Sequence, residues 1–186
     1  MSWSIDDSKR VWNDSIATTA KLEEAIDQLS DEETRGVQTL VFDRCLRLQK
    51  LPHNLHRFTQ LQVLSLRKCH GLIALDNLPA TVKTLDLSYC LKLRSLNWLN
   101  EPIERLSLEG DNWLEEWHFP LHLKELNLRG LYIRSLPVLP RTVEYLYVGG
   151  TDIVPQLLNA LKRERPSLTI DMGEPNSDEP IRWKTS

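Results

Sequence analysis

The stretch "VKTLDLSYC", residues 82–90, decides the fold, because close variants of it recur along the chain. Successive copies begin 24, 21, 21, 20 and 20 residues apart. We number the positions of each copy from 0 to 8, starting at its first apolar residue. A fixed period of this length indicates a repeat architecture. The other copies are "VQTLVFDRC" from Val37, "LQVLSLRKC" from Leu61, "IERLSLEGD" from Ile103, "LKELNLRGL" from Leu123 and "VEYLYVGGT" from Val143.

Each copy carries apolar residues at positions 0, 3 and 5. The alternation at positions 3 and 5 predicts a short strand with one buried face. A unit of about 20 residues cannot close a hydrophobic core alone, so we expect the units to stack and pair their strands in parallel. Prolines punctuate the segments between the strands, at Pro79, Pro102, Pro120 and Pro140. We therefore expect extended chain or single 3₁₀ turns there, not long helices.

These units resemble leucine-rich repeats, whose pattern LxxLxLxx(N/C)xL they follow over residues 37–153. The resemblance implies an α/β leucine-rich-repeat solenoid with a parallel concave β-sheet and an irregular convex side. The phrases "LPATVKTLDL" (78–87) and "LPRTVEYLYV" (139–148) resemble repeats of bacterial effector proteins delivered into host cells. The Cys-x-x-Leu-x-x-Leu rhythm also resembles repeats of plant immune receptors. In larger effectors a ubiquitin-ligase domain follows the repeats, and we expect no room for one here.

Both ends of such a stack need covering. Residues 1–36 predict an N-terminal helical cap, with a helix from about residue 14 that Asp14 or Ser15 would cap. Residues 154–172 predict a C-terminal helix-strand cap, with a helix opening at Pro155 and an edge strand at 167–172. Residues 173–186 are polar and predict a mobile tail. The apolar face of the N-terminal helix would consist of Ile16, Ala20, Leu22, Ile26 and Leu29.

Composition narrows the function classes. A net charge of −3 predicts no nucleic-acid partner. No apolar run is long enough for a membrane span, and no secretory signal opens the chain. Three cysteines, an odd number, favour a reducing compartment over a disulfide scaffold. We expect a cytoplasmic protein, or one secreted into a host cell without a cleaved signal peptide, as the effector resemblance implies. The oligomeric state stays open.

The first candidate for a chemically active site is a set of three cysteines. Cys45, Cys69 and Cys90 all occupy position 8 of their copies. The resemblance implies that this side chain turns inward and satisfies the backbone of the loop leaving the strand, so we expect buried, inert thiols. A disulfide between neighbouring units is the alternative. No histidine spacing completes a zinc site, and no nucleophile, base and orienting group converge. The sequence therefore predicts no enzyme, metal or cofactor.

The remaining candidate is the concave face, onto which positions 2, 4, 6 and 7 should point. Tyr145 and Tyr147 lie beside Gly149 and Gly150, which we expect to leave the tyrosine rings uncovered. The two tyrosines would then either bind a partner or be covered by the C-terminal helix. We also expect cross-strand charge neutralisation within the pairs Arg67–Asp86, Arg105–Glu125 and Glu109–Arg129. The candidate protein-binding residues are Arg67, Asp86, Ser88, Tyr89, Arg105, Glu109, Glu125, Asn127, Arg129, Tyr145 and Tyr147.

A second candidate surface lies on the convex side, where Trp98, Trp113, Trp117 and Phe119 either shield a wide loop or form an aromatic patch. The sequence thus favours a non-catalytic module that recognises a partner protein through the concave sheet. Two alternatives remain: a substrate-recognition relative of the ubiquitin-ligase effectors, and a structural or self-assembling protein that pairs through the edge strand near residues 168–172.

Overall fold

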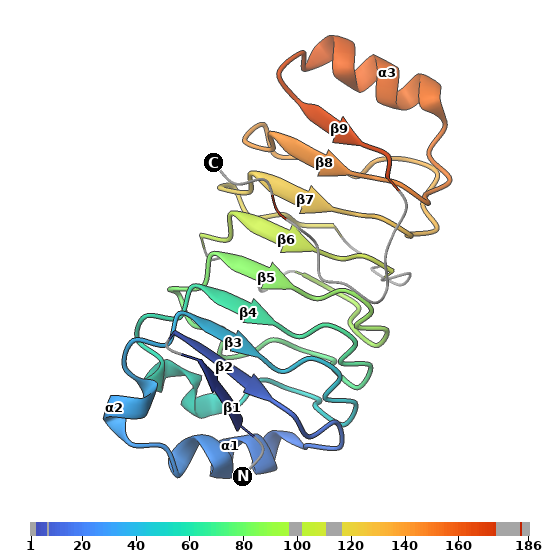
Figure 1. The fold of residues 1–186 in the computed structure, drawn as a ribbon. Helices are drawn as coiled ribbons and strands as arrows, with labels where there is room; N and C mark the ends of the chain where they lie inside the picture. The colour runs from blue at the N-terminus through green and yellow to red at the C-terminus, as the bar shows by residue number, and fades with distance from the viewer. Residues whose placement is uncertain (1–2, 7, 97–101, 111–116, 174–182, 184–186) are drawn as a thin grey trace.

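A computed structural model describes residues 3–6, 8–96, 102–110, 117–173 and 183. Within them, nine strands form one sheet in chain order from β1 to β9, and every neighbouring pair is parallel except β1 and β2 (Figure 1). The strands are β1 Trp3–Asp6, β2 Lys9–Trp12, β3 Thr39–Val41, β4 Val63–Ser65, β5 Thr84–Asp86, β6 Arg105–Ser107, β7 Glu125–Asn127, β8 Tyr145–Tyr147 and β9 Thr169–Asp171.

The six copies of the repeat supply strands β3 to β8 in one continuous register. Position 3 of each copy pairs with position 3 of the next, so the leucines form a single column across the sheet. All six side chains are fully buried, and positions 0 and 5 add two further buried columns behind the same face. The predicted parallel stack is therefore confirmed. The leucine column consists of Leu40, Leu64, Leu85, Leu106, Leu126 and Leu146.

Position 7 of every copy takes the left-handed backbone conformation. It is Arg44, Lys68 or Tyr89 in the first three copies, each with φ near +61°, and Gly110, Gly130 or Gly150 in the last three. Glycine adopts this conformation without a steric penalty, whereas other residues pay for it. A tight left-handed turn at the end of each strand therefore explains the glycines in the later copies.

The return segments contain little regular structure, as the prolines predict. One 3₁₀ helix, η1 His53–Arg57, begins directly after Pro52. Trp117 packs against the core, with its ring 5.8 Å from that of Phe119. The predicted convex aromatic patch also includes Trp98 and Trp113, which lie outside the described residues.

Two helices cover the N-terminal end of the stack, α1 Thr19–Asp27 and α2 Asp31–Thr34 (Figure 1). The predicted start of α1 near Asp14 is wrong, because Asp14 instead accepts a hydrogen bond from the backbone N–H of Ile16 in a local turn. Thr18 caps the helix, and Ile16 is exposed instead of joining its apolar face. Leu22 and Ile26 are buried as predicted.

The N-terminal cap also contains a hairpin that the sequence does not predict. Strands β1 and β2 pair antiparallel, and β2 extends the repeat sheet by pairing with β3. The ring of Trp3 lies 4.9 Å from that of Trp12 and 5.9 Å from that of Phe42. The first buried repeat is thus covered by aromatic side chains as well as by helices.

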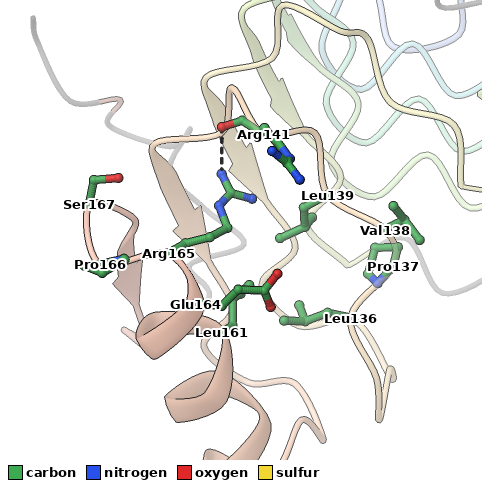
Figure 2. Close-up of a pocket in the computed structure, with 10 residues that line it drawn as sticks. All are labelled: Leu136, Pro137, Val138, Leu139, Arg141, Leu161, Glu164, Arg165, Pro166 and Ser167. Carbon is green, nitrogen blue, oxygen red and sulfur yellow. Dashed lines mark hydrogen bonds between the residues drawn. The ribbon is translucent and has the colours of Figure 1, made fainter.

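At the C-terminal end, helix α3 Pro155–Glu164 begins at Pro155, and β9 pairs with β8. Arg165, just after the helix, donates hydrogen bonds to the backbone carbonyls of Pro140, Arg141 and Val143. An open hollow of about 640 Å³ lies between α3 and the loop carrying Val138, and Figure 2 shows the residues that line it. These hydrogen bonds of Arg165 attach the end of α3 to the last repeat. Arg165 also lines the hollow, so the hollow lies where α3 joins the solenoid.

Candidate protein-binding face

The concave face is the face of the sheet opposite the leucine columns, and all the candidate residues except Tyr89 lie on it; Tyr89 lies at its rim. The structure buries many more of them than the sequence suggests. Four are half-buried: Tyr89, Arg105, Arg129 and Tyr145. The other seven are buried: Arg67, Asp86, Ser88, Glu109, Glu125, Asn127 and Tyr147.

The buried polar residues form a network that runs across the strands. At its N-terminal end the carboxylate of Asp43 accepts hydrogen bonds from the Ser65 hydroxyl and from the backbone N–H of Arg67. The guanidinium of Arg67 lies 3.9 Å from the carboxylate of Asp86, as predicted, and 3.8 Å from that of Glu109. One cation therefore bridges carboxylates from two different repeats.

The centre of the network depends on Asn127, which is fully buried. Its amide donates to the Ser107 hydroxyl at 2.9 Å and to the Glu109 carboxylate at 3.1 Å. Its carbonyl oxygen accepts a hydrogen bond from the backbone N–H of Arg129 at 3.1 Å. Ser107 in turn contacts the Ser88 hydroxyl at 2.7 Å, which joins three consecutive repeats. Buried polar groups need such partners, because an unsatisfied one costs free energy.

Three of the four half-buried residues are held by carboxylates, two of them from the next repeat and one from β9. The Tyr89 hydroxyl donates to Glu109 at 3.0 Å, and Arg105 Nε donates to Glu125 at 2.8 Å as predicted. The predicted pair Glu109–Arg129 is replaced, since Arg129 donates to Asp171 of β9 at 2.9 Å. The face therefore shows arginine and tyrosine side chains whose orientations are fixed from beneath.

The prediction that Gly149 and Gly150 leave the tyrosine rings uncovered is wrong for Tyr147. A Cβ atom on Gly149 would lie 1.8 Å from the carbonyl oxygen of Gly173, so this glycine makes room for the returning backbone. Tyr147 is 3% exposed, and its ring meets the ring of Trp183 edge-on, at 6.3 Å between centroids and 81° between planes.

The cysteines lie as the buried-thiol interpretation predicts. All three are free and fully buried. The thiols of Cys69 and Cys90 donate to the carbonyl oxygens of Phe42 and Leu66, and that of Cys45 reaches Asp14. The neighbouring Cys45 thiol and burial raise the pKa of Cys69 well above its ordinary value, which keeps the thiol protonated and unreactive.

None of the described helices is long and apolar enough to cross a lipid bilayer. In that same part of the chain, no cluster of three or more histidine, cysteine, aspartate or glutamate side chains is arranged to hold a metal ion.

Burial raises the pKa of the Asp86 carboxyl, more than its hydrogen bonds with Ser88 and the charge of Arg67 lower it. The folded-state pKa thus lies above the unfolded value near 3.8. The proton on Asp86 therefore stabilises the fold at low pH, and this contribution disappears as the pH rises through the folded-state pKa. An asparagine at position 86 has the same shape and does not titrate, so its stability would not fall in this way as the pH rises.

We expect Asp86→Asn to gain stability relative to the wild-type chain as the pH is raised from about 3, with a plateau once the folded-state pKa has been passed. Denaturant unfolding at a series of pH values measures this difference. Asp14→Asn is the control of opposite sign, because its hydrogen bond from Lys21 lowers the pKa of Asp14. A stability difference for Asp86→Asn that stays flat or falls with pH would contradict the prediction.

Three features recur in register in all six copies: a three-residue parallel strand, buried apolar residues at positions 0, 3 and 5, and a left-handed turn at position 7. The chain is a leucine-rich-repeat solenoid. No family model matches the sequence. The repeat assignment therefore rests on the spacing of the solenoid's units and on their common geometry.

The sequence is similar to parts of two plant proteins. It is 40% identical over 75 residues to the disease resistance protein RRS1B of Arabidopsis thaliana. It is 39% identical over 95 residues to the protein SUPPRESSOR OF npr1-1, CONSTITUTIVE 1 of the same plant. These matches cover 39% and 48% of the solenoid but only 6% of each relative. Both relatives are plant proteins, and the first is named as a disease resistance protein.

A leucine-rich-repeat protein of Leptospira interrogans is a structural match. It is 13% identical, with a TM-score of 0.36, and the match covers 77% of this chain and 51% of that one.

Proposed function

We propose that the solenoid is a non-catalytic module that binds a partner protein through its concave face. One observation carries this proposal: the half-buried residues Tyr89, Arg105 and Arg129 are each oriented by a carboxylate, which comes from the next repeat for Tyr89 and Arg105 and from β9 for Arg129. Arginine and tyrosine are enriched at the energetic centres of protein interfaces. Side chains that are fixed before binding lose less conformational entropy when a partner arrives.

The arrangement is costly for folding alone. Glu109 and Glu125 are charged side chains with 2% and 4% of their surface exposed. Burying charges in this way stabilises a fold little or not at all compared with apolar packing. A face that binds a partner gives those carboxylates a role, because they set the geometry of the cations and hydroxyls above them.

A second proposal concerns the biological process in which the solenoid binds its partner. The two relatives belong to plants, and one is named as a disease resistance protein, which favours recognition of a protein in immunity. The repeat phrasing at 78–87 and 139–148 supports the second candidate, a bacterial effector that binds a host protein. Both settings require the same concave face, so one experiment addresses the shared property.

We expect Arg105→Ala and Arg129→Ala each to lower capture of the partner by about tenfold or more, as loss of an interface hot spot does. The chain is immobilised, exposed to plant or infected-host lysate, and the captured proteins are quantified by mass spectrometry. Arg134→Ala is the matched control, since Arg134 is exposed on a return segment. A genuine partner is depleted by both concave variants and retained by the control. If every captured protein is retained equally by all three variants, the proposal is rejected.

A further inference from the structure

The backbone that leaves β9 turns onto the concave face. The Asp171 carboxylate accepts hydrogen bonds from Arg129 at 2.9 Å and from the backbone N–H of Gly173 at 2.7 Å. Gly173 lies directly against Gly149, where no side chain would fit. Gly149 occupies position 6, which carries polar or charged side chains in the five preceding repeats. The last repeat thus accommodates main chain at the place where the others present side chains.

Trp183, farther along the same segment, contacts the concave face as well. Its ring meets Tyr147 edge-on, and it is half-buried. Tyr147 is itself fixed, because its hydroxyl donates to Glu125 at 3.2 Å and the Arg129 guanidinium lies 4.8 Å from its ring centroid. These contacts make a site for an aromatic ring: Tyr147 supplies an aromatic partner, and Arg129 and Glu125 hold Tyr147 in place.

The occupant is a tryptophan between two basic residues, since Arg182 and Lys184 flank Trp183 in the chain. The carboxylates around Tyr147 each have an arginine partner on the same face: Glu109 lies beside Arg67, Glu125 beside Arg105 and Asp171 beside Arg129. The tryptophan ring therefore supplies the contact, and the basic residues define the sequence that a competing segment would share with the occupant.

We propose that the Tyr147 site recognises a peptide segment with a tryptophan beside basic residues, and that the chain's own Trp183 occupies the site until such a segment displaces it. The inference rests on the proposed function, because it names the chemistry of the segment that the concave face binds. A tethered occupant competes at an effective concentration in the millimolar range. A single edge-on ring contact is weak enough for a partner with further contacts to replace it.

The test uses the full chain and a fluorescein-labelled peptide with the sequence of residues 174–186. We expect the peptide to bind Trp183→Ala at least tenfold more tightly than the wild-type chain in fluorescence polarisation, because the variant has lost its internal competitor. The same peptide with alanine in place of tryptophan should bind Trp183→Ala at least tenfold more weakly. Tyr132→Ala is the matched control, since Tyr132 is an exposed aromatic residue on the return segment after β7, and it should behave as wild type.

Equal affinity for the wild-type and Trp183→Ala chains would overturn the inference, as would absence of binding to both. Equal affinity of the two peptides for Trp183→Ala would also overturn it. Adding Tyr147→Leu to Trp183→Ala should abolish binding. If that double variant melts at a lower temperature, the comparison of the two peptides decides the matter without it.

The partner-capture experiment separates this inference from the proposed function. Trp183→Ala is expected to raise partner capture by the same factor by which it raises peptide affinity. Capture that depends on Arg105 but is unchanged by Trp183→Ala rejects the inference and leaves the proposed function standing. The opposite outcome is also possible: the peptide binds as expected, but neither Arg105→Ala nor Arg129→Ala lowers the capture of any protein. That result rejects the proposed function and supports the aromatic site.

Discussion

Leu85→Ala is expected to lower the free energy of unfolding by about 2–5 kcal/mol, the range for removing a large buried aliphatic side chain. Leu85 lies in the middle of the leucine column, fully buried, with Leu64 and Leu106 as its paired neighbours. The cavity cannot be filled by one repeat moving alone, because each strand is held in register by the strands on both sides. Denaturant unfolding followed by circular dichroism measures the change.

The control for this prediction is Leu121→Ala. Leu121 is 81% exposed, so the same loss of atoms should change stability by no more than about 0.5 kcal/mol. Similar losses in the two variants would show that the column is not the core of the solenoid. A loss confined to Leu85→Ala supports the role of inter-repeat packing.

Asn127→Ala is expected to cost about 2–4 kcal/mol, even though no apolar contact is at stake. The substitution leaves the Ser107 hydroxyl, the Glu109 carboxylate and the backbone N–H of Arg129 without the partner that Asn127 supplies. Burial makes these losses large, because water cannot replace the missing hydrogen bonds. The same unfolding measurement applies.

Asn13→Ala is the matched control for Asn127→Ala. The Asn13 amide also donates to a serine hydroxyl, that of Ser4, but this hydrogen bond is exposed to solvent. Its loss should change stability by less than about 1 kcal/mol. If Asn127→Ala is equally mild, the concave polar network does not contribute to folding as its burial implies.

The repeat core could be predicted in detail because its signal is local and repeated. Positions 3 and 5 alternate in every copy, and a slip of one residue would turn Leu64 or Leu85 out of the core. Six agreeing copies therefore determine both the strands and their register. The C-terminal helix was equally readable, since Pro155 is suited to the first turn of a helix.

The N-terminal hairpin could not be predicted from the sequence, because a charged residue of β2 is buried and an apolar one is partly exposed. In β2 the buried side chains are Arg10 and Trp12, while Val11 between them is only half-buried. Arg10 is accommodated by donating to the backbone carbonyl of Glu33, a residue of α2. With a charged residue on the buried face, this four-residue strand lacks the apolar alternation by which a strand is recognised in a sequence. The burial of Arg10 becomes understandable only from its contact with α2.

The concave site was predictable in its positions and only partly in its partners. Neighbouring repeats bring Arg105 to Glu125 because the two share position 2 in adjacent strands. Arg129 takes Asp171 instead, since β9 adds one more strand beside β8 and offers a carboxylate at the edge. The cover over Tyr147 could not be foreseen, because Trp183 lies within a polar stretch that carries no periodic pattern.

The left-handed turns at position 7 divide the solenoid into two halves with different chemical character. In the first three repeats the turn carries a side chain, and the rim there is built by Arg44, Lys68 and Tyr89. In the last three the turn is glycine: Gly110 is buried against the ring of Tyr89, Gly130 is half-buried and Gly150 is exposed. The amides of Gly110 and Gly130 already donate to the next repeat, so they hold the stack together and are not offered to a ligand. A ligand laid along the rim would therefore meet projecting side chains as far as Tyr89 and none at the turns beyond it, so its first end must match charge while its second end can approach the solenoid closely.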